Sequence, residues 1–463
     1  MAATISNMTS GFIDLATYDE LEKYMYGGPN ATAYFVRETR KATWFTNVPV
    51  ALSNTSGVPA FGANWSVGIS RAGDYLLQTW LRVLVPAVTV TNAAPIQTWS
   101  WVPNFMHNLV QECSITFNDL VAARFDSAHL DFWTAFTVPA SKQIGYNNMI
   151  GNGLFGQIRN VNTASPASWL NLPLPFFYSR DSGVALPTAA LPYNDMRINF
   201  SFRTAAQMVV LYNAAGALPA AAVAPVLVPA APVLTCQVWA NYAIVSNEER
   251  KRMACAPRDI LIEQVQSSQT NAYNATATQG PQQFNIRFSH AVKVLFFSAE
   301  GAEGAAALQA GQRLSNYSDA ALTGAGGVGT LPVPGAGAID PVANASLIYE
   351  NTQRLAQMGA DYFSLVSPYY SAPCIPGGVA GANSIGPSPV GYHEYSYSLD
   401  FINLDPLGST NYGKLTNVSL QVQPPGANSP AVGAGIAAMN LVITAVNNNI
   451  IRIAGGALGF PVL

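Results

Sequence analysis

The sequence contains few charged residues. Only 10% of its 463 residues are Asp, Glu, Lys or Arg, against about 25% in typical soluble proteins. The formal net charge is −3, and the Lys and Arg residues are scattered, so the clustered positive charge that binds a phosphate backbone is lacking. We therefore expect no direct binding to nucleic acid. Because 49% of the residues are hydrophobic, we expect much of the surface to become protein interface.

Cysteine and histidine are scarce as well. Cys113, Cys236, Cys255 and Cys374 are far apart and form no CxxC pair, which favours buried, reduced thiols over a disulfide framework or a zinc site. The four histidines form no HxH pair, which argues against the copper site of hydroxylases built from two sandwich domains. The GxSxG, HExxH and P-loop motifs do not occur.

These absences predict a protein that is not an enzyme, with no catalytic residue, no cofactor and no metal site. Carboxylates that converge in space without a local spacing would escape such a search. In a chain with only 25 Asp and Glu residues, a structural role is the favoured interpretation.

Long apolar segments without proline are also missing. The uncharged run 214–237 carries Pro219, Pro225, Pro229 and Pro232, which predicts a linker or long loop rather than a membrane-spanning helix. The first seven residues have no basic start and no apolar run, so we expect no signal peptide and assembly in the cytoplasm.

The sequence does contain a β-strand pattern that occurs twice. Apolar and polar residues alternate from Cys113 to Phe117, a polar turn follows, and a short amphipathic segment ends in Asp131-Phe-Trp133. The same layout returns at Ser346–Asn351 and Asp361-Tyr-Phe363. The chain therefore contains one module followed by a second, similar one.

Three further features recur in the same order, with offsets that differ only by loop-sized amounts. They pair Thr17-Tyr-Asp-Glu20 with Ser246-Asn-Glu-Glu249, Ser66–Trp80 with Asn285–Phe297, and Asp195–Phe202 with Asn417–Val422. The first pair predicts two capping boxes, and each of them begins a short helix. The helix that begins at Thr17 is expected to end at Gly27-Gly28-Pro29. Strands are expected to follow these helices at residues 31–43 and 259–265.

Each copy holds many short strands separated by Gly, Pro, Asn and Ser turns. This pattern predicts an antiparallel sandwich or jelly roll in each of two domains, rather than a βαβ fold. The remaining residues fall in three long loops, at residues 139–170, 301–338 and 373–393.

Several local motifs suggest chemistry but have simpler explanations. Gly324-Ala-Gly-Gly-Val-Gly329 matches the dinucleotide fingerprint, but Leu331-Pro-Val-Pro334 follows and opposes the helix that this fingerprint needs, so we predict a flexible surface loop. Asp126, His129 and Asp131 lie close together beside Arg124, where a solvated or salt-bridged helix end is favoured over a metal site.

Nine Asn-X-Ser/Thr sequons occur, which we interpret as a by-product of an Asn/Ser/Thr-rich composition. They are at Asn7, Asn30, Asn54, Asn64, Asn199, Asn274, Asn316, Asn344 and Asn417.

Long and distinctive motifs from near the N-terminus to the last residue closely resemble those of the major capsid proteins of iridoviruses. They are Ser10-Gly-Phe-Ile-Asp-Leu-Ala-Thr-Tyr18, Gly145-Tyr-Asn-Asn-Met-Ile-Gly151, Leu172-Pro-Leu-Pro-Phe-Phe-Tyr-Ser-Arg-Asp-Ser-Gly183, Leu191-Pro-Tyr-Asn194, Arg287-Phe-Ser-His-Ala-Val-Lys293, Gly408-Ser-Thr-Asn-Tyr-Gly413, Asn449-Ile-Ile-Arg452 and Gly459-Phe-Pro-Val-Leu463. The loops near Ala220, Gly324 and Gly433 depart from the family pattern.

The resemblance implies an all-β fold of two tandem antiparallel eight-stranded jelly rolls with short helices in loops. It divides the chain into an N-terminal arm and short helix at residues 1–30, a first jelly roll at 31–245 and a second at 246–463. It further implies homotrimeric, pseudo-hexagonal capsomers in the icosahedral outer shell of a virion, above an internal membrane. In the family, the N-terminal arm lies on the inner side of the shell, near minor capsid proteins and that membrane.

Two other classes of function stay open at this point. A carbohydrate-binding or adhesin-like double sandwich would need an exposed aromatic platform, for which Tyr369-Tyr370 or Tyr392–Tyr397 are the candidates. A two-domain β-sandwich enzyme would need a converging cluster of ionisable groups.

Overall fold

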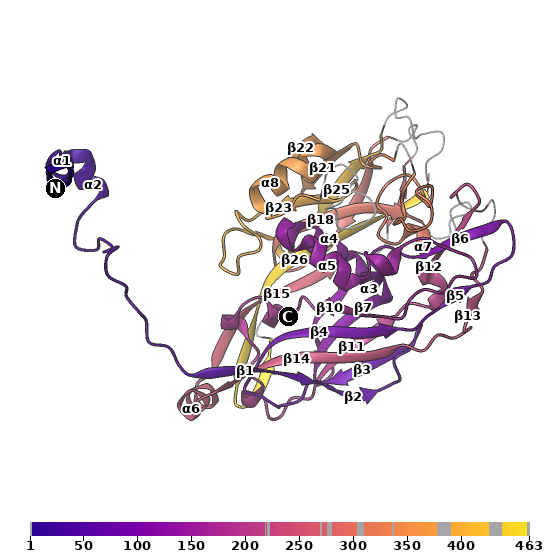
Figure 1. Cartoon of the computed structure of the whole chain (residues 1–463), viewed down its shortest axis with the longest axis horizontal. Helices are drawn as coiled ribbons and strands as arrows, with labels where there is room; N and C mark the ends of the chain where they lie inside the picture. The colour runs from indigo at the N-terminus through magenta and orange to yellow at the C-terminus, as the bar shows by residue number, and fades with distance from the viewer. Residues whose placement is uncertain are drawn as a thin grey trace. The chain divides into compact units, whose positions relative to one another are not determined.

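In the computed structural model, strands in antiparallel sheets are the main regular structure, and fewer residues lie in helices (Figure 1). The structure describes residues 2–217, 219, 223–268, 271–275, 280–302, 310–335, 338–376, 390–425 and 438–460. Its internal contacts divide the chain into two units, residues 1–44 and residues 45–463. Among the described residues, no helix is both long enough and apolar enough to span a bilayer.

The N-terminal unit contains two helices, α1 (Ala2–Ala16) and α2 (Glu20–Met25). The predicted capping box at Thr17 is wrong, because the Thr17 hydroxyl donates to the Asp14 carbonyl and Asp19 caps α2 instead. The predicted end of α2 before Gly27 and Gly28 is confirmed, since both glycines have positive φ angles.

The strand predicted at residues 31–43 is also wrong, because these residues form no strand. Tyr34, Phe35 and Val36 favour extended backbone, but a strand also needs hydrogen bonds from a neighbouring strand. The side chains of residues 31–43 are exposed, and the first strand begins at Phe45.

The strands that precede Ser246 form two main sheets, which we call the first roll. One sheet has the order β1-β14-β4-β10, and the other has the order β3-β11-β7-β8 with β2 added beside β3. Counted along the chain, the eight main strands are arranged 1-8-3-6 and 2-7-4-5, which is the jelly-roll order. Their bounds are β1 (Phe45–Ala51), β2 (Ser53–Ser56), β3 (Asn64–Gly68), β4 (Tyr75–Val85), β7 (Val110–Phe117), β8 (Leu120–Asp126), β10 (Ser168–Pro173), β11 (Met196–Phe202) and β14 (Thr235–Val245).

The strands after α6 (Asn247–Cys255) form the second roll, with the same order. Its main sheets run β15-β26-β18-β23 and β17-β25-β21-β22, again 1-8-3-6 and 2-7-4-5. Two tandem antiparallel jelly rolls are therefore confirmed. The bounds are β15 (Arg258–Ser267), β17 (Gln282–Ile286), β18 (Ala291–Gly301), β21 (Asn344–Tyr349), β22 (Thr352–Gly359), β23 (His393–Ser396), β25 (Val418–Gln423) and β26 (Ala438–Ala454).

The two rolls match in local detail. The turn between β7 and β8 has two residues with positive φ, Asn118 and Asp119, and the turn between β21 and β22 has the pair Glu350 and Asn351. Two consecutive positive φ angles define the type I′ turn, whose twist suits a tight hairpin. The predicted repeat of strand, polar turn and aromatic segment is thus a repeated hairpin.

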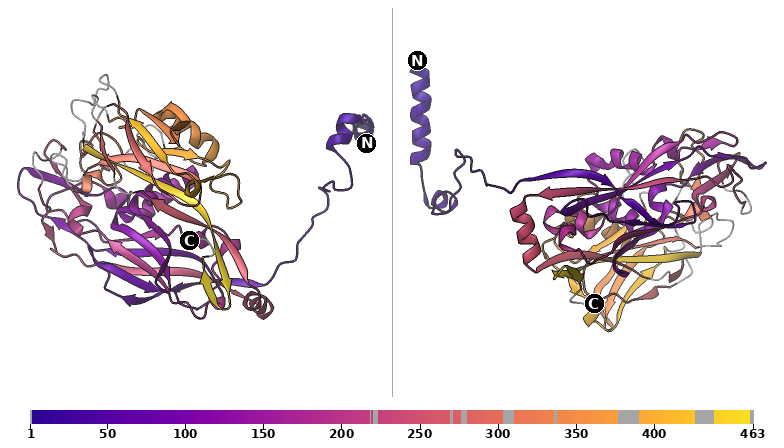
Figure 2. Two further views of the ribbon diagram at one scale, coloured as in Figure 1. Left: turned by 180° about the vertical axis from the view of Figure 1, so that it is seen from behind. Right: turned by 90° about the horizontal axis from the view of Figure 1, so that it is seen from below.

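The apolar side chains of each roll meet between its two sheets. In the first roll, Leu81, Val83 and Ile115 are among the fully buried residues. β26 has seventeen residues, and its two halves lie in different cores. Leu441 and Ile443 pack in the core of the second roll, whereas Ile451 and Ile453 pack in that of the first. Figure 2 shows the orange and yellow strands of the second roll beside the purple strands of the first.

The helix α4 (Ser127–Thr137), which follows β8 in the first roll, covers the outer face of the second roll. Its Phe132 and Phe136 rings stack on Phe296 of β18 at centroid distances of 6.1 and 5.5 Å. Val294 and Val446 of the same sheet belong to this cluster and are buried. The sheet β15-β26-β18-β23 is therefore packed on both faces (Figure 1).

Parts of the predicted loops have regular structure. The loop at 139–170 contains α5 (Ala140–Ile150), and the loop at 301–338 contains α7 (Ala310–Arg313), β19 (Leu322–Thr323) and β20 (Val333–Pro334). The run 214–237 contains β13 (Leu227–Val228), which pairs with β5 (Thr89–Val90). Most of the loop predicted at 373–393 lies outside the described residues.

The remaining elements are short or lie beside the main sheets. They are α3 (Phe105–Leu109), α8 (Ser367–Ser371), β6 (Ile96–Trp101), β9 (Arg159–Asn160), β12 (Val209–Asn213), β16 (Asn271–Asn274), β24 (Thr410–Asn411), β27 (Ala457–Gly459), the 3-10 helices η1 (Leu154–Gly156), η2 (Phe177–Ser179), η3 (Ser182–Val184), η4 (Thr188–Ala190), η5 (Ala205–Met208) and η7 (Tyr412–Lys414), and the π-helix η6 (Tyr362–Val366).

The contact between α4 and the second roll should contribute strongly to stability. Phe296→Ala removes the ring on which Phe132 and Phe136 stack, and we expect the free energy of unfolding to fall by about 3–5 kcal/mol. Urea unfolding followed by circular dichroism measures this change. The control Phe35→Ala removes a fully exposed ring and should change stability by less than about 0.5 kcal/mol. Equal effects of the two substitutions would contradict this account.

Candidate functional site at the seam between the two rolls

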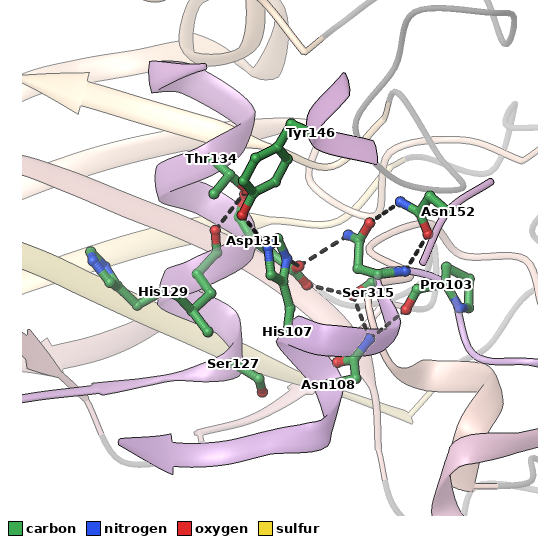
Figure 3. Close-up of polar contacts among 12 residues, drawn as sticks. Pro103, His107, Asn108, Ser127, His129, Asp131, Thr134, Tyr146, Asn152 and Ser315 are labelled. Atoms are coloured by element: carbon green, nitrogen blue, oxygen red, sulfur yellow. Dashed lines mark hydrogen bonds and ion pairs between the residues drawn. The ribbon is translucent and has the colours of Figure 1, made fainter. Parts of the chain in front are cut away.

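The sequence drew attention to Asp126, His129 and Asp131, and the structure separates them. Asp126 is the N-cap of α4, where its carboxylate accepts a hydrogen bond from the His129 backbone N–H at 2.8 Å. Figure 3 shows the His129 ring pointing away from Asp131. Arg124 lies outside this group and pairs loosely with Glu112 at 3.9 Å. The three side chains do not form a common metal site.

Asp131 is the centre of a buried polar cluster that joins the two rolls (Figure 3). Its Oδ1 accepts hydrogen bonds from Asn104 Nδ2 at 3.0 Å and from His107 Nδ1 at 2.6 Å. Its Oδ2 accepts from the hydroxyls of Ser315 at 2.5 Å and Tyr317 at 3.2 Å. Asn104 and His107 belong to the first roll, whereas Ser315 and Tyr317 lie in the long connection between β18 and β21 of the second.

The partners of His107 determine its tautomer. Nδ1 faces the Asp131 carboxylate and donates to it, and the tautomer with its proton on Nδ1 accepts at Nε2. Nε2 lies 2.7 Å from the hydroxyl of Tyr146 on α5. Burial raises the pKa of Tyr146, with a further contribution from Asp131, so this hydroxyl stays protonated and donates to His107. Tyr146, His107 and Asp131 therefore form a chain of hydrogen bonds that runs from α5 through α3 to α4.

This chain resembles a nucleophile–base–acid triad only in its order. A phenol with a raised pKa is a poor nucleophile, because its reactive form is the phenolate. Asp131 has two donors on each carboxylate oxygen, so its capacity to accept hydrogen bonds is used within the protein. The arrangement suits a buried, satisfied polar contact that fixes one roll against the other.

A second network crosses the same seam. Arg180, between the first-roll helices η2 and η3, lies 3.3 Å from Glu263 of β15, and the other oxygen of Glu263 lies 2.6 Å from the buried Lys293 Nζ of β18. Lys293 also donates to the Asn403 carbonyl at 2.7 Å, and the Arg180 guanidinium stacks over Trp133 of α4 at 4.5 Å. Buried charges need such partners, because an unpaired one costs several kcal/mol.

His129 lies beside this second network, with its ring 5.8 Å from that of Trp133. Within the described residues, its Nδ1 is buried without a hydrogen-bond partner. Burial, with a smaller contribution from the Arg180 guanidinium, lowers the pKa of His129 to about 3. The ring is therefore neutral in the folded protein across the physiological range of pH.

A groove of about 900 Å³ opens beside the seam. One wall is the outer face of the sheet β14-β4-β10, with Gln78, Trp80 and Pro173, and the other wall is formed by α4 and α5, with Lys142 and Tyr146. Ionisable groups do not converge in it, because Lys142 is exposed and Arg180 is paired with Glu263.

The other sequence motifs lie apart from this site. Gly324–Gly329 follows the short strand β19 and forms turns, and no helix begins on it, as predicted. Cys113 and Cys374 are buried and Cys236 is partly buried, but Cys255 at the end of α6 is exposed, so the expectation of four buried thiols is wrong for that residue. Among the described residues, no group of three His, Cys, Asp or Glu side chains is placed to hold a metal ion. The prediction of no catalytic, cofactor or metal site stays a prediction.

His107, Tyr146, Ser315 and Arg180 were not singled out in the sequence. His107 and Asp131 are 24 positions apart, and Ser315 follows Asp131 by 184 positions, so no local spacing could have revealed them. The one usable indication was an Asp inside the apolar segment 127–137, because a buried carboxylate needs donors from elsewhere.

His129 should make stability depend on pH. Its pKa is about 6.5 in the unfolded chain and about 3 in the folded one, so below pH 6.5 only the unfolded state takes up the proton. Burial raises the pKa of Glu300 and Glu394 to about 7, so these carboxyls stabilise the fold as the pH is lowered from 7 to 5. His129 acts in the opposite direction and should lower the free energy of unfolding by about 2 kcal/mol over the same range. The variant His129→Gln should lack this contribution, which urea unfolding at the two pH values measures. His290→Asn, at a partly exposed site, is the control, and the same pH dependence of stability in the wild type and in His129→Gln would contradict the assignment.

Two family descriptions match consecutive parts of the chain. Residues 33–245 match the family "Major capsid protein N-terminus", and residues 249–459 match "Large eukaryotic DNA virus major capsid protein". Similar curated proteins cover the whole length. The major capsid protein of Costelytra zealandica iridescent virus is 56% identical over all of both chains, and that of Frog virus 3 (isolate Goorha) is 40% identical over all of both chains.

Solved structures share the fold at low identity. PBCV-1 VP54, fitted into a reconstruction of the virophage Sputnik, has a TM-score of 0.71 at 21% identity and covers 93% of this chain and all of its own. The Faustovirus major capsid protein has a TM-score of 0.65 at 12% identity over 95% of each chain. The family matches and the full-length relatives agree with the double jelly roll. The chain therefore belongs to the major capsid protein family of large eukaryotic DNA viruses, and it is a structural protein of the viral capsid.

Proposed function

We propose that three copies of this chain form a closed, pseudo-hexagonal capsomer and that such capsomers tile the icosahedral outer shell of the virion. The observation that carries this proposal is the identical strand order of the two rolls. Two similar rolls per chain and three chains per ring give six similar corners, so a trimer can occupy a hexagonal lattice. A cyclic trimer needs head-to-tail contacts between different surfaces, and two rolls with different exposed faces provide them.

The division of the chain also remains a proposal. We assign residues 1–30 to the arm, residues 31–245 to the first jelly roll and residues 246–463 to the second. The helix α1 exposes Phe12, Ile13 and Leu15, and residues 1–44 form a unit of their own by contacts. An exposed apolar helix needs a partner, and we infer that the arm contacts minor capsid proteins or the inner viral membrane on the inside of the shell. Assembly is proposed to take place in the host cytoplasm.

A carbohydrate-binding or adhesin-like role is the alternative. Tyr369 and Tyr370 are 70% and 79% exposed, as the residues of an aromatic platform would be, and their rings lie edge to face at 5.1 Å. The other candidate platform loses its support, because Tyr392 and Tyr395 are buried. Binding of a monomeric protein to a glycan array would favour this alternative over capsomer formation.

The mass of the purified protein tests the capsomer directly. Size-exclusion chromatography with light scattering should give about three times the chain mass of 49.1 kDa. The expected reason is the low surface charge combined with the exposed apolar faces of the rolls. A monomer that persists at micromolar concentration would overturn the proposal.

Deletion of residues 1–25 should separate capsomer formation from shell formation. The first strand begins at Phe45, so the deletion removes no strand of either roll, and the protein should remain soluble as a trimer. Shells should fail to form, because the apolar arm residues are lost. Electron microscopy of particles assembled with the deleted and the full-length protein measures this. Shells of normal number and shape from the deleted protein would refute the docking role.

A further inference from the structure

The two rolls differ in how the outer faces of their equivalent sheets are covered. On the second roll, Val294 and Phe296 of β18 point outward and are buried under α4. On the first roll, the outward Trp80 of β4 is only partly buried and stacks on Trp239 of β14 at 6.5 Å. The neighbouring Trp169 of β10 is 41% exposed. The first roll thus has an aromatic outer face that is partly exposed, whereas the equivalent face of the second roll is covered by α4.

A shared irregularity aligns the two sheets residue by residue. In the pairing of β4 with β14, the register shifts at Leu77, and in the pairing of β18 with β26 it shifts at Lys293. Matching these bulges places Gln78 at the position of Val294 and Trp80 at the position of Phe296. On the other side of each strand, Trp80 pairs with Pro173 of β10 and Phe296 pairs with Glu394 of β23, which is the sixth strand of its roll as β10 is of the first.

The groove of about 900 Å³ lies over this matching position. Gln78, Trp80 and Pro173 form its sheet wall, together with Asn171 and Asn241. On the second roll, the corresponding space is filled by the rings of Phe132 and Phe136. Within the described part of the chain, the first roll therefore has a groove where the second roll has a docked helix.

The chain also carries a helix equivalent to α4 that is not docked in this way. The helix α4 follows the fifth strand of the first roll, and the helical segment 360–371, which contains η6 and α8, follows the fifth strand of the second. Phe132 and Phe136 come five and nine residues after Ser127, and Leu365 and Tyr369 come five and nine residues after Ala360. Leu365 and Val366 are each 44% exposed, and Tyr369 and Tyr370 are more exposed still.

We propose that the segment 360–371 of one copy of this chain inserts into the groove of the first roll of the next copy. This inference rests on the proposed capsomer and specifies the contact that holds it together. Leu365, Val366, Tyr369 and Tyr370 then cover Gln78 and Trp80, as Phe132 and Phe136 cover Val294 and Phe296 within one chain.

The symmetry of a closed ring favours this occupant. One copy offers a helix on its second roll and a groove on its first, so the contact is head-to-tail and can close into a ring. Two versions of one contact then alternate around the ring. Within a chain, α4 of the first roll covers the second roll. Between chains, the segment 360–371 of the second roll covers the first roll of the next copy. Each of the six sheets of this type becomes covered on both faces.

The chemistry of the two surfaces is also compatible. Tyrosine and tryptophan are enriched where interfaces gain most of their binding energy, because they combine a large apolar area with a polar atom. The exposed side offers two tyrosines, and the groove offers Trp80 beside the side-chain amides of Gln78, Asn171 and Asn241. These amides can pair with the phenol hydroxyls, so insertion need not leave the hydroxyls without partners.

The test compares the mass of variants across a dilution series by size-exclusion chromatography with light scattering. The double variant Tyr369→Asp and Tyr370→Asp places two charges in the proposed contact, and half-assembly should require at least about tenfold more protein than in the wild type. Asn171→Lys, on the groove side, should have an effect in the same direction. Tyr24→Asp replaces a tyrosine that is 90% exposed on α2 and should leave the dilution profile unchanged.

Circular dichroism and thermal unfolding confirm that the variants are folded, which is expected because Tyr369 and Tyr370 are exposed in the single chain. A wild-type monomer would refute the capsomer itself. A wild-type trimer whose dilution profile is unchanged by both the tyrosine and the Asn171 variants would refute only this contact. If deletion of residues 1–25 abolishes the trimer and the tyrosine variants have no effect, the N-terminal arm and not the segment 360–371 occupies the groove. This outcome would also overturn the proposal.

Discussion

A β-sheet has two faces, and a jelly roll buries only one face of each of its sheets. Alternating residues of a strand point to opposite faces, so an apolar residue on the outer face needs a cover from outside the roll. In this chain, Phe296 obtains that cover from α4, a helix that belongs to the other roll. Trp80, at the matching position, is only partly buried and stacks on Trp239. This difference places one packed seam within the chain and one open groove on its surface.

The packed seam combines apolar and polar contacts that need each other. The rings of Phe132 and Phe136 exclude water from the seam, and Asp131 lies on the same helix among four donors. Removal of water makes these hydrogen bonds stronger and also makes any unmatched partner costly. Two of the donors come from each roll, so a shift of one roll against the other would leave Asp131 unsatisfied. The polar cluster thus fixes a geometry that apolar packing alone would leave less well defined.

The sequence predicted the two repeated jelly rolls well. It predicted less well which residues begin and end the helices and strands, and it did not predict the Asp131 cluster. Alternation around Ile115 and Ile198 predicted strands, because β7 and β11 are neighbours in one sheet that buries a single face in the core. The strand predicted at residues 31–43 failed, because Tyr34 and Phe35 favour extended backbone but have no neighbouring strand. The helix α5 was missed because its stability comes from packing, such as the contacts of Tyr146 with His107 and of Gln143 with Cys374. The Asp131 cluster joins residues far apart in the sequence, and only the folded chain brings them together.

The path of β26 affects how the protein is made. Ile451 and Ile453, near the end of the chain, complete the core of the roll that is translated first. That core therefore has gaps until the ribosome has synthesised nearly the whole polypeptide. The early half must wait in an incomplete state, with strand edges and apolar side chains accessible to other molecules. The two rolls are therefore completed together, late in synthesis. A product truncated before β26 would leave both rolls incomplete rather than only the second.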